Sequence, residues 1–107
     1  MMIQVLFLQQ PDGELLGFQM TGHSGLAEEG SDILCAAVSS AAYLVANAIT
    51  DVVQVRADLT VSQGSMSLQV PEKAVFLCRN LLQGLKLHLV GLQEQYPDNI
   101  SINYTEV

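Results

Sequence analysis

One segment of the sequence holds the residue types of a thiol-based active site: His23 directly after Gly22, and Cys35 beyond a glycine-containing stretch. Ser31 or Asp32 is a suitable helix N-cap, which predicts that Cys35 lies in the first turn of a helix. There the helix dipole and the unpaired backbone N–H groups favour a thiolate. The same N–H groups could bind the oxyanion that forms when a thiolate attacks a carbonyl group. His23, at the end of a predicted strand, could act as base and then as acid towards a leaving amine.

Asp32, Cys35 and Ser39 follow an i, i+3, i+7 spacing, which predicts that they share one face of this helix. Asp32 could orient His23 or cap the helix, and Ser39 could hydrogen-bond into the site or to a backbone carbonyl. The residue types alone leave a structural interpretation open as well. A single cysteine in an alanine-rich helix can pack as a small hydrophobe, and a histidine among glycines can be a turn residue.

Alternating apolar residues predict two β-hairpins and a last strand. The first hairpin joins residues 3–7 to residues 16–20 through the turn Pro11-Asp12-Gly13. The second joins residues 53–61 to residues 66–70 through Ser62-Gln63-Gly64. The last strand covers residues 100–104. Each strand has one apolar and one polar face, which indicates a sheet covered on one side only.

Two helices are predicted between these strands. The first covers about residues 31–50 and is crowded with small side chains. The second begins after Pro71 and stops before Pro97, as proline prefers helix boundaries. Its apolar residues recur at spacings of three and four and form one face: Cys78, Leu81, Leu82, Leu85, Leu89, Leu92 and Tyr96. A second stripe (Phe76, Leu87, Val90) predicts either a further buried face, through a homodimer, or a few exposed apolar residues.

The predicted order of elements is therefore β-β-α-β-β-α-β. Neither a repeat nor a linker interrupts it, so residues 1–107 are expected to form a single domain. The expected fold class is α/β of the α+β type. We expect a two-layer sandwich in which two helices pack on one face of a mostly antiparallel five-stranded sheet.

The composition narrows the classes of function. The chain has 107 residues and a formal net charge of −7, and its four basic residues are scattered: Arg56, Lys73, Arg79 and Lys86. Direct nucleic-acid binding needs clustered basic residues and is disfavoured, whereas a basic protein partner would be attracted.

The chain is expected to be cytoplasmic, with reduced thiols. No basic segment precedes the apolar N-terminus, which speaks against a signal peptide. The uncharged run 33–49 is rich in alanine and has acidic flanks, so a buried helix fits it better than a membrane span.

Cys35 and Cys78 are far apart and are disfavoured as a disulfide; with His23 and His88 they make a poor zinc site, so no metal or cofactor is expected. Cys78 is expected to pack in the core and His88 to lie at its boundary.

The segment around the histidine and the cysteine resembles the signature of the bacterial ribosomal-processing cysteine protease family. That signature is Gly-His, a glycine-containing loop and Gly-x-Asp-Ile-x-Cys-Ala-Ala-x-Ser. In this chain it reads Gly22-His23, then Gly30-Ser31-Asp32-Ile33-Leu34-Cys35-Ala36-Ala37-Val38-Ser39. The order of elements and the chain length extend the resemblance to the whole sequence.

The resemblance implies a cytoplasmic thiol protease that removes the N-terminal extension of a large-subunit ribosomal protein, with a part in ribosome biogenesis. Relatives cut after an apolar stretch that contains aromatic residues, and they form homodimers. By position in the motif, Cys35 is the nucleophile and His23 the base, while Gly22, Asp32 and Ser39 occupy supporting positions. A basic ribosomal precursor would suit the acidic chain, and neither nucleic acid nor membrane is implied as a partner. Leu26 stands where many relatives carry an aromatic residue, which affects the expected substrate pocket.

Other functions are compatible with parts of this pattern. A non-catalytic ribosome-assembly or binding factor would use the acidic surface and the exposed helix stripe, and would not need a reactive thiol. A hydrolase of small thioesters or amides would need Cys35 but would show no peptide preference. Redox sensing is disfavoured because no resolving cysteine lies near Cys35 in the sequence.

Overall fold

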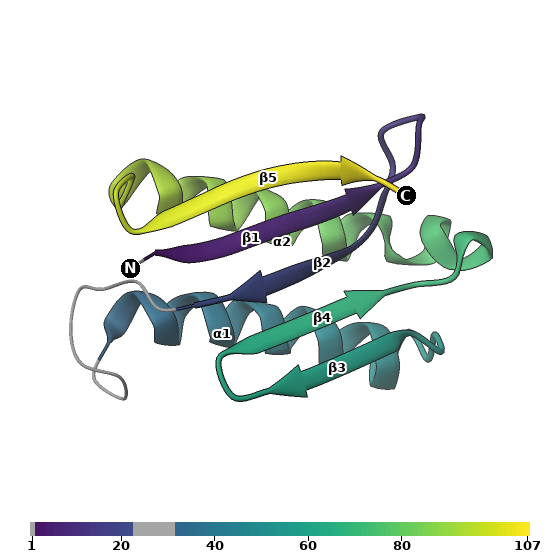
Figure 1. Ribbon diagram of the computed structural model, residues 1–107. Coiled ribbons are helices and arrows are strands. Elements are labelled where there is room, and N and C mark those ends of the chain that lie inside the picture. The colour runs from purple at the N-terminus through teal and green to yellow at the C-terminus, as the bar shows by residue number, and fades with distance from the viewer. Residues whose placement is uncertain (1, 23–31) are drawn as a thin grey trace.

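The computed structural model describes residues 2–22 and 32–107. Their order along the chain is the predicted one (Figure 1): β1 (Ile3–Gln9), β2 (Leu15–Thr21), α1 (Ile33–Asn47), β3 (Asp58–Ser62), β4 (Ser65–Gln69), α2 (Val75–Gln95) and β5 (Ile100–Glu106). A π-helical turn, Ala48–Val52, continues α1, and a 3-10 turn, Glu72–Ala74, precedes α2.

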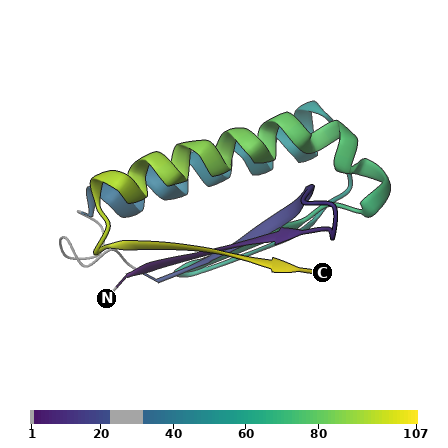
Figure 2. The same cartoon turned by 90° about the horizontal axis from the view of Figure 1, so that it is seen from above.

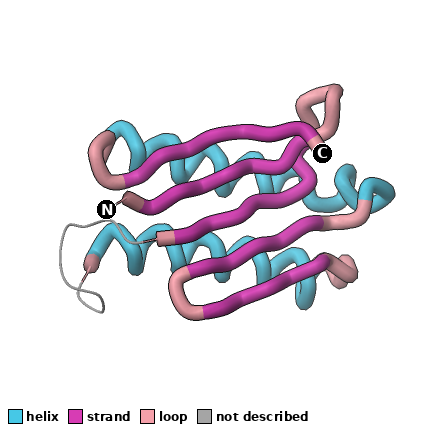
Figure 3. Tube along the Cα trace, in the orientation of Figure 1, coloured by secondary structure: helices cyan, strands magenta, loops and turns pink. Residues whose placement is uncertain are grey.

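The strands form a mixed, mostly antiparallel sheet in the order β3-β4-β2-β1-β5 (Figure 3). The pairs β1–β2, β2–β4 and β3–β4 are antiparallel, as hairpins and short returns allow. The pair β1–β5 is parallel, because the chain crosses over through α2 before it returns beside β1. The first strand thus lies inside the sheet, between β2 and the last strand.

Both helices pack on the same face of the sheet, so the expected two-layer sandwich is confirmed (Figure 2). On the covered face, Phe7 lies opposite Phe18, and Phe18 lies opposite Leu68. These three side chains are almost completely buried. The opposite face is predominantly polar and includes the exposed Gln4 and Gln19. This difference between the faces explains the alternation that the sequence shows.

Helix α1 supplies its small and branched side chains to the core. Its buried residues recur at helical spacing: Leu34, Val38, Ala42, Val45 and Ala46. The continuous helical segment Ile33–Val52 is long and apolar enough to cross a membrane by length and composition. Its buried residues belong to the hydrophobic core that the two layers share. The observed start at Ile33, after an Asp32 N-cap, agrees with the predicted helix to within two residues.

Helix α2 buries the middle of its predicted apolar face, with Cys78, Leu82, Leu85 and Leu89 in the core. Leu81, Leu92 and Tyr96 are half-buried and pack against that core. The second stripe is open in the single chain, where Phe76 is 74% and Leu87 is 76% exposed.

The predicted strand over residues 53–61 is wrong in its first half. Residues 53–57 are not in a strand; β3 begins only at Asp58. The reason is the π-helical turn, after which Gln54 adopts a positive φ of 64° that interrupts an extended backbone. Val55 is buried, and Val53 and Ala57 pack against the core, so their alternation reflects a connecting segment that turns apolar side chains inward.

The edge strands are also less covered than the alternation predicted. All five residues of β3 are exposed. In β5, burial falls from Ile100 to Tyr104, which is 43% exposed. Tyr104 stacks on Phe7 with a ring separation of 5.9 Å and has the Lys86 ammonium 5.0 Å from its ring centroid.

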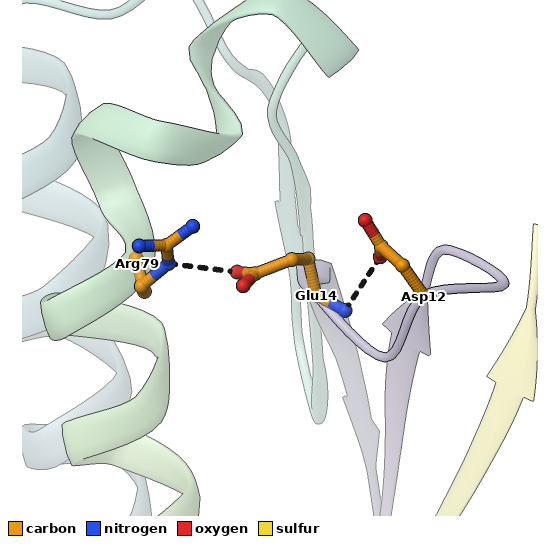
Figure 4. Close-up of polar contacts among 3 residues, drawn as sticks. All are labelled: Asp12, Glu14 and Arg79. Carbon is orange, nitrogen blue, oxygen red and sulfur yellow. Dashed lines mark hydrogen bonds and ion pairs between the residues drawn. The ribbon is translucent and has the colours of Figure 1, made fainter.

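The β1–β2 connection is tied to the start of α2 (Figure 4). Arg79 Nε donates to Glu14 Oε2 at 3.0 Å, and the Glu14 backbone N–H donates to Asp12 Oδ1 at 2.9 Å. The ion pair is substantially exposed, so its contribution to stability is small. It holds the end of the sheet that lies away from the N-terminus of α1 (Figure 1).

Gly17 is the position in the sheet that tolerates a side chain least. A Cβ atom there would lie 1.9 Å from the backbone oxygen of Leu68, on the neighbouring strand β4. We expect Gly17→Ala to lower the free energy of unfolding by more than about 2 kcal/mol, because the backbone of β4 must move. Chemical denaturation would measure the loss.

The matched control is Gly84→Ala in α2, where an added Cβ meets nothing within 4 Å. This variant is expected to be neutral or more stable by up to about 1 kcal/mol, from the gain in helix propensity. Equal stability of the Gly17→Ala and Gly84→Ala proteins would contradict the close approach of β2 and β4.

Candidate active site

Cys35 lies in the first turn of α1, as the third residue of that helix. Its side chain is half-buried and packs beside the core, so the thiol is neither fully enclosed nor fully solvated. This position satisfies the main requirement for a helix-activated thiol, because the positive end of the helix dipole acts within the first turn.

Asp32 is the N-cap of α1, which confirms one of the two roles considered for it. Its backbone is extended, and its Oδ1 accepts a hydrogen bond from the Cys35 backbone N–H at 3.0 Å. Its carbonyl oxygen accepts the first helical bond, from Ala36, at 3.0 Å. Only 5% of the residue is exposed, and it is the one buried charged or polar residue among those described. A buried carboxylate is stabilised by such charge-assisted bonds.

The cap changes the expectation for an oxyanion site. The backbone N–H of Cys35 points to Asp32 Oδ1 and is therefore already engaged. When the Cys35 sulfur attacks a carbonyl carbon, the oxyanion of the tetrahedral intermediate would need hydrogen-bond donors other than this N–H. Oxyanion binding by the remaining N–H groups of the first turn stays a prediction, because the capping side chain satisfies one of these groups.

Gly22 fixes the direction in which the chain leaves β2. Its φ of +93° belongs to the left-handed region that glycine adopts without strain. A Cβ atom would also lie 2.7 Å from the backbone oxygen of Met2, at the start of β1. Its N–H donates to the carbonyl of Gly64 at 3.1 Å, in the turn between β3 and β4. Gly22 thus joins β2 to both neighbouring parts of the sheet immediately before His23.

A cleft of about 220 Å³ lies beside Cys35. One wall comes from α1, with Cys35, Ser39 and Tyr43, and another from the end of β2 around Gly22. The turn between β3 and β4 supplies further lining residues: Ser62, Gly64, Ser65 and Met66. Four residues of the motif, Gly22, Asp32, Cys35 and Ser39, therefore line a single cleft.

Ser39 is exposed and lies one turn after Cys35 in the wall of the cleft. Its position in the lining is compatible with a hydrogen bond into the site, and both of its predicted roles stay predictions. Tyr43 lies one helical turn after Ser39 and lines the cleft as well. It was not identified from the sequence. The i, i+4, i+8 spacing from Cys35 would have found it.

His23 lies outside the described residues, as do Leu26 and the two glutamates Glu28 and Glu29. The expected proximity of the His23 imidazole to the Cys35 thiol therefore stays a prediction from the motif.

The other cysteine and histidine lie away from the cleft. Cys78 is buried in α2, and desolvation raises the pKa of its thiol, so it stays protonated at neutral pH. His88 borders an apolar groove between the two helices, in keeping with the expected boundary position. Residues 2–22 and 32–107 contain no group of three or more His, Cys, Asp or Glu side chains that could hold a metal ion.

Asp32→Ala should weaken the start of α1, since the Cys35 N–H loses its acceptor. We expect a loss of about 1 kcal/mol in the free energy of unfolding, with Asp32→Asn retaining most of the stability because an asparagine oxygen caps equally well. Urea denaturation of the three proteins measures the difference. An equal loss in both variants would show that the negative charge of Asp32, rather than the cap, carries its contribution.

Comparison with known proteins identifies the family of the chain. A family model described as cysteine protease Prp matches residues 2–101. The ribosomal processing cysteine protease Prp of Bacillus subtilis is 28% identical over 107 residues, which cover 94% of this chain and 96% of the relative. Its namesake in Staphylococcus aureus strain Mu50 is 28% identical over 105 residues, covering 96% of this chain and 99% of the relative.

Solved structures agree in fold. The essential ribosomal processing protease Prp from S. aureus, crystallised with a covalently linked product peptide, has a TM-score of 0.89 and 27% identity, over 97% of this chain and all of that one. A Streptococcus mutans protein has a TM-score of 0.84 and 27% identity, over 99% of this chain and 96% of that one. The chain belongs to the cysteine protease Prp family and is a cysteine protease.

Proposed function

We propose that this protease removes the N-terminal extension of a large-subunit ribosomal protein, with Cys35 as the nucleophile and His23 as the general base. The observation that carries the proposal is the position of Cys35 in the first turn of α1, at the wall of a cleft, within the family's motif. Relatives named for ribosomal processing support the class of substrate. Two S. aureus structures hold a substrate peptide or a covalently linked product peptide.

The proposed reaction proceeds through a thioester. His23 takes the proton of the Cys35 thiol, and the sulfur attacks the carbonyl carbon of the scissile peptide bond. The tetrahedral oxyanion collapses as the C–N bond breaks, and the His23 imidazolium protonates the departing amine. A water molecule then attacks the thioester with His23 as base, which releases the new carboxylate and restores the thiol.

Asp32 acts in this scheme as a positioning residue. By capping α1 it fixes the turn that carries Cys35, and its engagement of the Cys35 N–H leaves the oxyanion to other donors at the helix start. The N–H groups of Ile33 and Leu34 precede Cys35 in that turn and have no partner within the described part of the chain. They are the proposed oxyanion donors, assisted by the helix dipole.

The surroundings of the cleft suit a basic substrate in the cytoplasm. The side chains that line the cleft include the carboxylate of Asp32 and no lysine or arginine. With a net charge of −7, the protein attracts a basic ribosomal precursor and repels nucleic acid, which supports a role in ribosome biogenesis. No disulfide joins Cys35 to Cys78, as a reducing compartment favours.

A homodimer is part of the proposal, and the helical layer offers a surface for it. Leu44 of α1 is 70% exposed, and Phe76, Leu77 and Leu87 of α2 are 74%, 56% and 76% exposed. Between the helices lies a groove of about 290 Å³ whose lining is mostly apolar and includes Ala41, Leu81 and Leu85. Exposed apolar groups of this extent are typical of protein interfaces.

The catalytic assignment is tested with a synthetic peptide that spans the extension of the ribosomal protein. The wild type is expected to make one cut, identified by mass spectrometry, whereas Cys35→Ala and His23→Ala should each reduce cleavage by at least about a thousandfold. Cys78→Ala provides a matched cysteine control and should cut at a normal rate, since Cys78 is buried away from the cleft.

An intact peptide after incubation with folded wild-type protein would refute this substrate. Cleavage by the Cys35→Ala variant would refute the nucleophile, and cleavage by His23→Ala at the wild-type rate would refute the base.

The dimer is tested by light scattering during size-exclusion chromatography. The wild type should elute with the mass of two chains, and Leu44→Glu or Leu87→Glu should shift it towards one, because a charge would be buried in the interface. Gln19→Glu, an exposed position on the open face of the sheet, adds the same charge away from the helical layer and should leave the dimer intact. A wild-type protein that is monomeric at micromolar concentration would contradict the proposal.

A further inference from the structure

Three sulfur-containing side chains line the cleft at the start of α1. Two of the four methionines of the chain, Met20 and Met66, belong to its lining together with Cys35. Met20 comes from the end of β2 and Met66 from the start of β4, and α1 begins at the same end of the sheet (Figure 1). The proposed proteolysis uses the thiol and neither of the two thioethers.

The register of the sheet brings the two methionines together. Met20 lies directly opposite Met66 in the antiparallel pair β2–β4. Residues in this position share one face of the sheet, with Cβ atoms about 5 Å apart. Both side chains are on the face that the helices cover, and they are only 6% and 7% exposed. A methionine side chain is unbranched and has three rotatable bonds, so both thioethers can adjust to a common ion in the cleft.

Two thioethers and one thiolate form a donor set for a soft cation. Zn²⁺ takes cysteine, histidine and carboxylate ligands, and the described residues contain no group of three such side chains. Mg²⁺ and Ca²⁺ require oxygen ligands. Cu(I) is the ion that thiolate and thioether sulfur atoms select. A thiolate and a monovalent cation also neutralise each other, which lowers the free-energy cost of holding a charge at the half-buried Cys35.

We propose that Cys35, Met20 and Met66 bind one Cu(I) ion in the cleft, and that this ion inhibits the protease reversibly. A sulfur–copper bond replaces the S–H bond of Cys35, the proton leaves to solvent, and copper keeps its +1 oxidation state. The sulfur is then no longer available to attack a peptide carbonyl. The inhibition rests on the proposed role of Cys35 as nucleophile, whereas the binding does not.

The binding is tested by titration with Cu(I) under nitrogen, with the coloured Cu(I) chelator bicinchoninate as competitor. The wild type is expected to take up one Cu(I) per chain, and Cys35→Ala should take up none. Met20→Leu/Met66→Leu nearly conserves the side-chain volumes, so the fold should persist. This variant should bind Cu(I) at least about tenfold more weakly, because removal of even an outer-shell partner of a metal costs that much.

Two matched controls remove a sulfur atom outside the cleft. Met2→Leu removes a thioether from a residue that is not part of the described lining, and Cys78→Ala removes the buried thiol of α2. Both variants should bind Cu(I) as the wild type does. If the double methionine variant did not fold, as judged by circular dichroism, the single variants Met20→Leu and Met66→Leu would give the same comparison.

The inhibition is tested on cleavage of the ribosomal peptide. One equivalent of Cu(I) should stop cleavage by the wild type, and excess bicinchoninate should restore it. The double methionine variant should need at least about tenfold more Cu(I) for the same inhibition, in line with its weaker binding.

Three results would overturn the inference: a wild type that leaves all Cu(I) with the chelator, equal affinities of the wild type and the double methionine variant, or cleavage that continues with Cu(I) bound. A wild type that binds one Cu(I) through the three sulfur atoms but cuts no peptide would refute the proposed function and support the copper site. The two levels of the proposal are therefore separated by the binding titration, which requires no substrate.

Discussion

The start of α1 is held by the hydrogen bond from the Cys35 backbone N–H to the Asp32 carboxylate, and the geometry of the cleft depends on it. Cys35 is the third residue of α1, so loss of the first turn would release the thiol from its place in the cleft wall. The same bond satisfies a buried carboxylate, which explains why a charged group is tolerated at this depth. The cap therefore keeps the turn that carries Cys35 folded at the cleft wall.

The cleft itself arises because a helix end meets a strand end. The two helices cover one face of the sheet, and the N-terminus of α1 lies at the edge of the sheet where β2 ends (Figure 1). The bond from Gly22 to the carbonyl of Gly64 holds the turn between β3 and β4 against the end of β2. Cys35 thus lies in a cleft whose lining residues are supplied by four separate parts of the chain: β1, the end of β2, α1 and the β3–β4 hairpin. Such rigid support favours catalysis because reacting groups need not be reordered when a substrate binds.

Much of this arrangement could be predicted from the sequence. The period of two in β1, β2 and β4 and the proline boundaries of α2 fixed the element types, and the motif pointed to Asp32 and Cys35. The segment 53–57 was mispredicted because the π-helical turn after α1, which depends on tertiary packing, converts an alternating pattern into a connection. The place of Ser62, Gly64 and Ser65 in the cleft wall could not be predicted, because it depends on where the turn between β3 and β4 lies in the folded sheet. The N-cap prediction implied that the capping side chain accepts a hydrogen bond from a backbone N–H of the first turn. Only the structure shows that this group is the Cys35 N–H, which is then not available to bind an oxyanion.

The parallel pairing of β1 with β5 has a consequence for how the protein is made. β5 pairs with β1 along its whole length, from Ile3 with Ile100 to Gln9 with Glu106, and Ile3 also borders the cleft. These contacts join the two ends of the chain, so they have the greatest sequence separation in the molecule and carry the largest loop-closure entropy. During synthesis β1 emerges before β5, and one of its edges stays open until β5 can pair with it. The part of the cleft wall to which Ile3 belongs is therefore completed only when β5 pairs with β1.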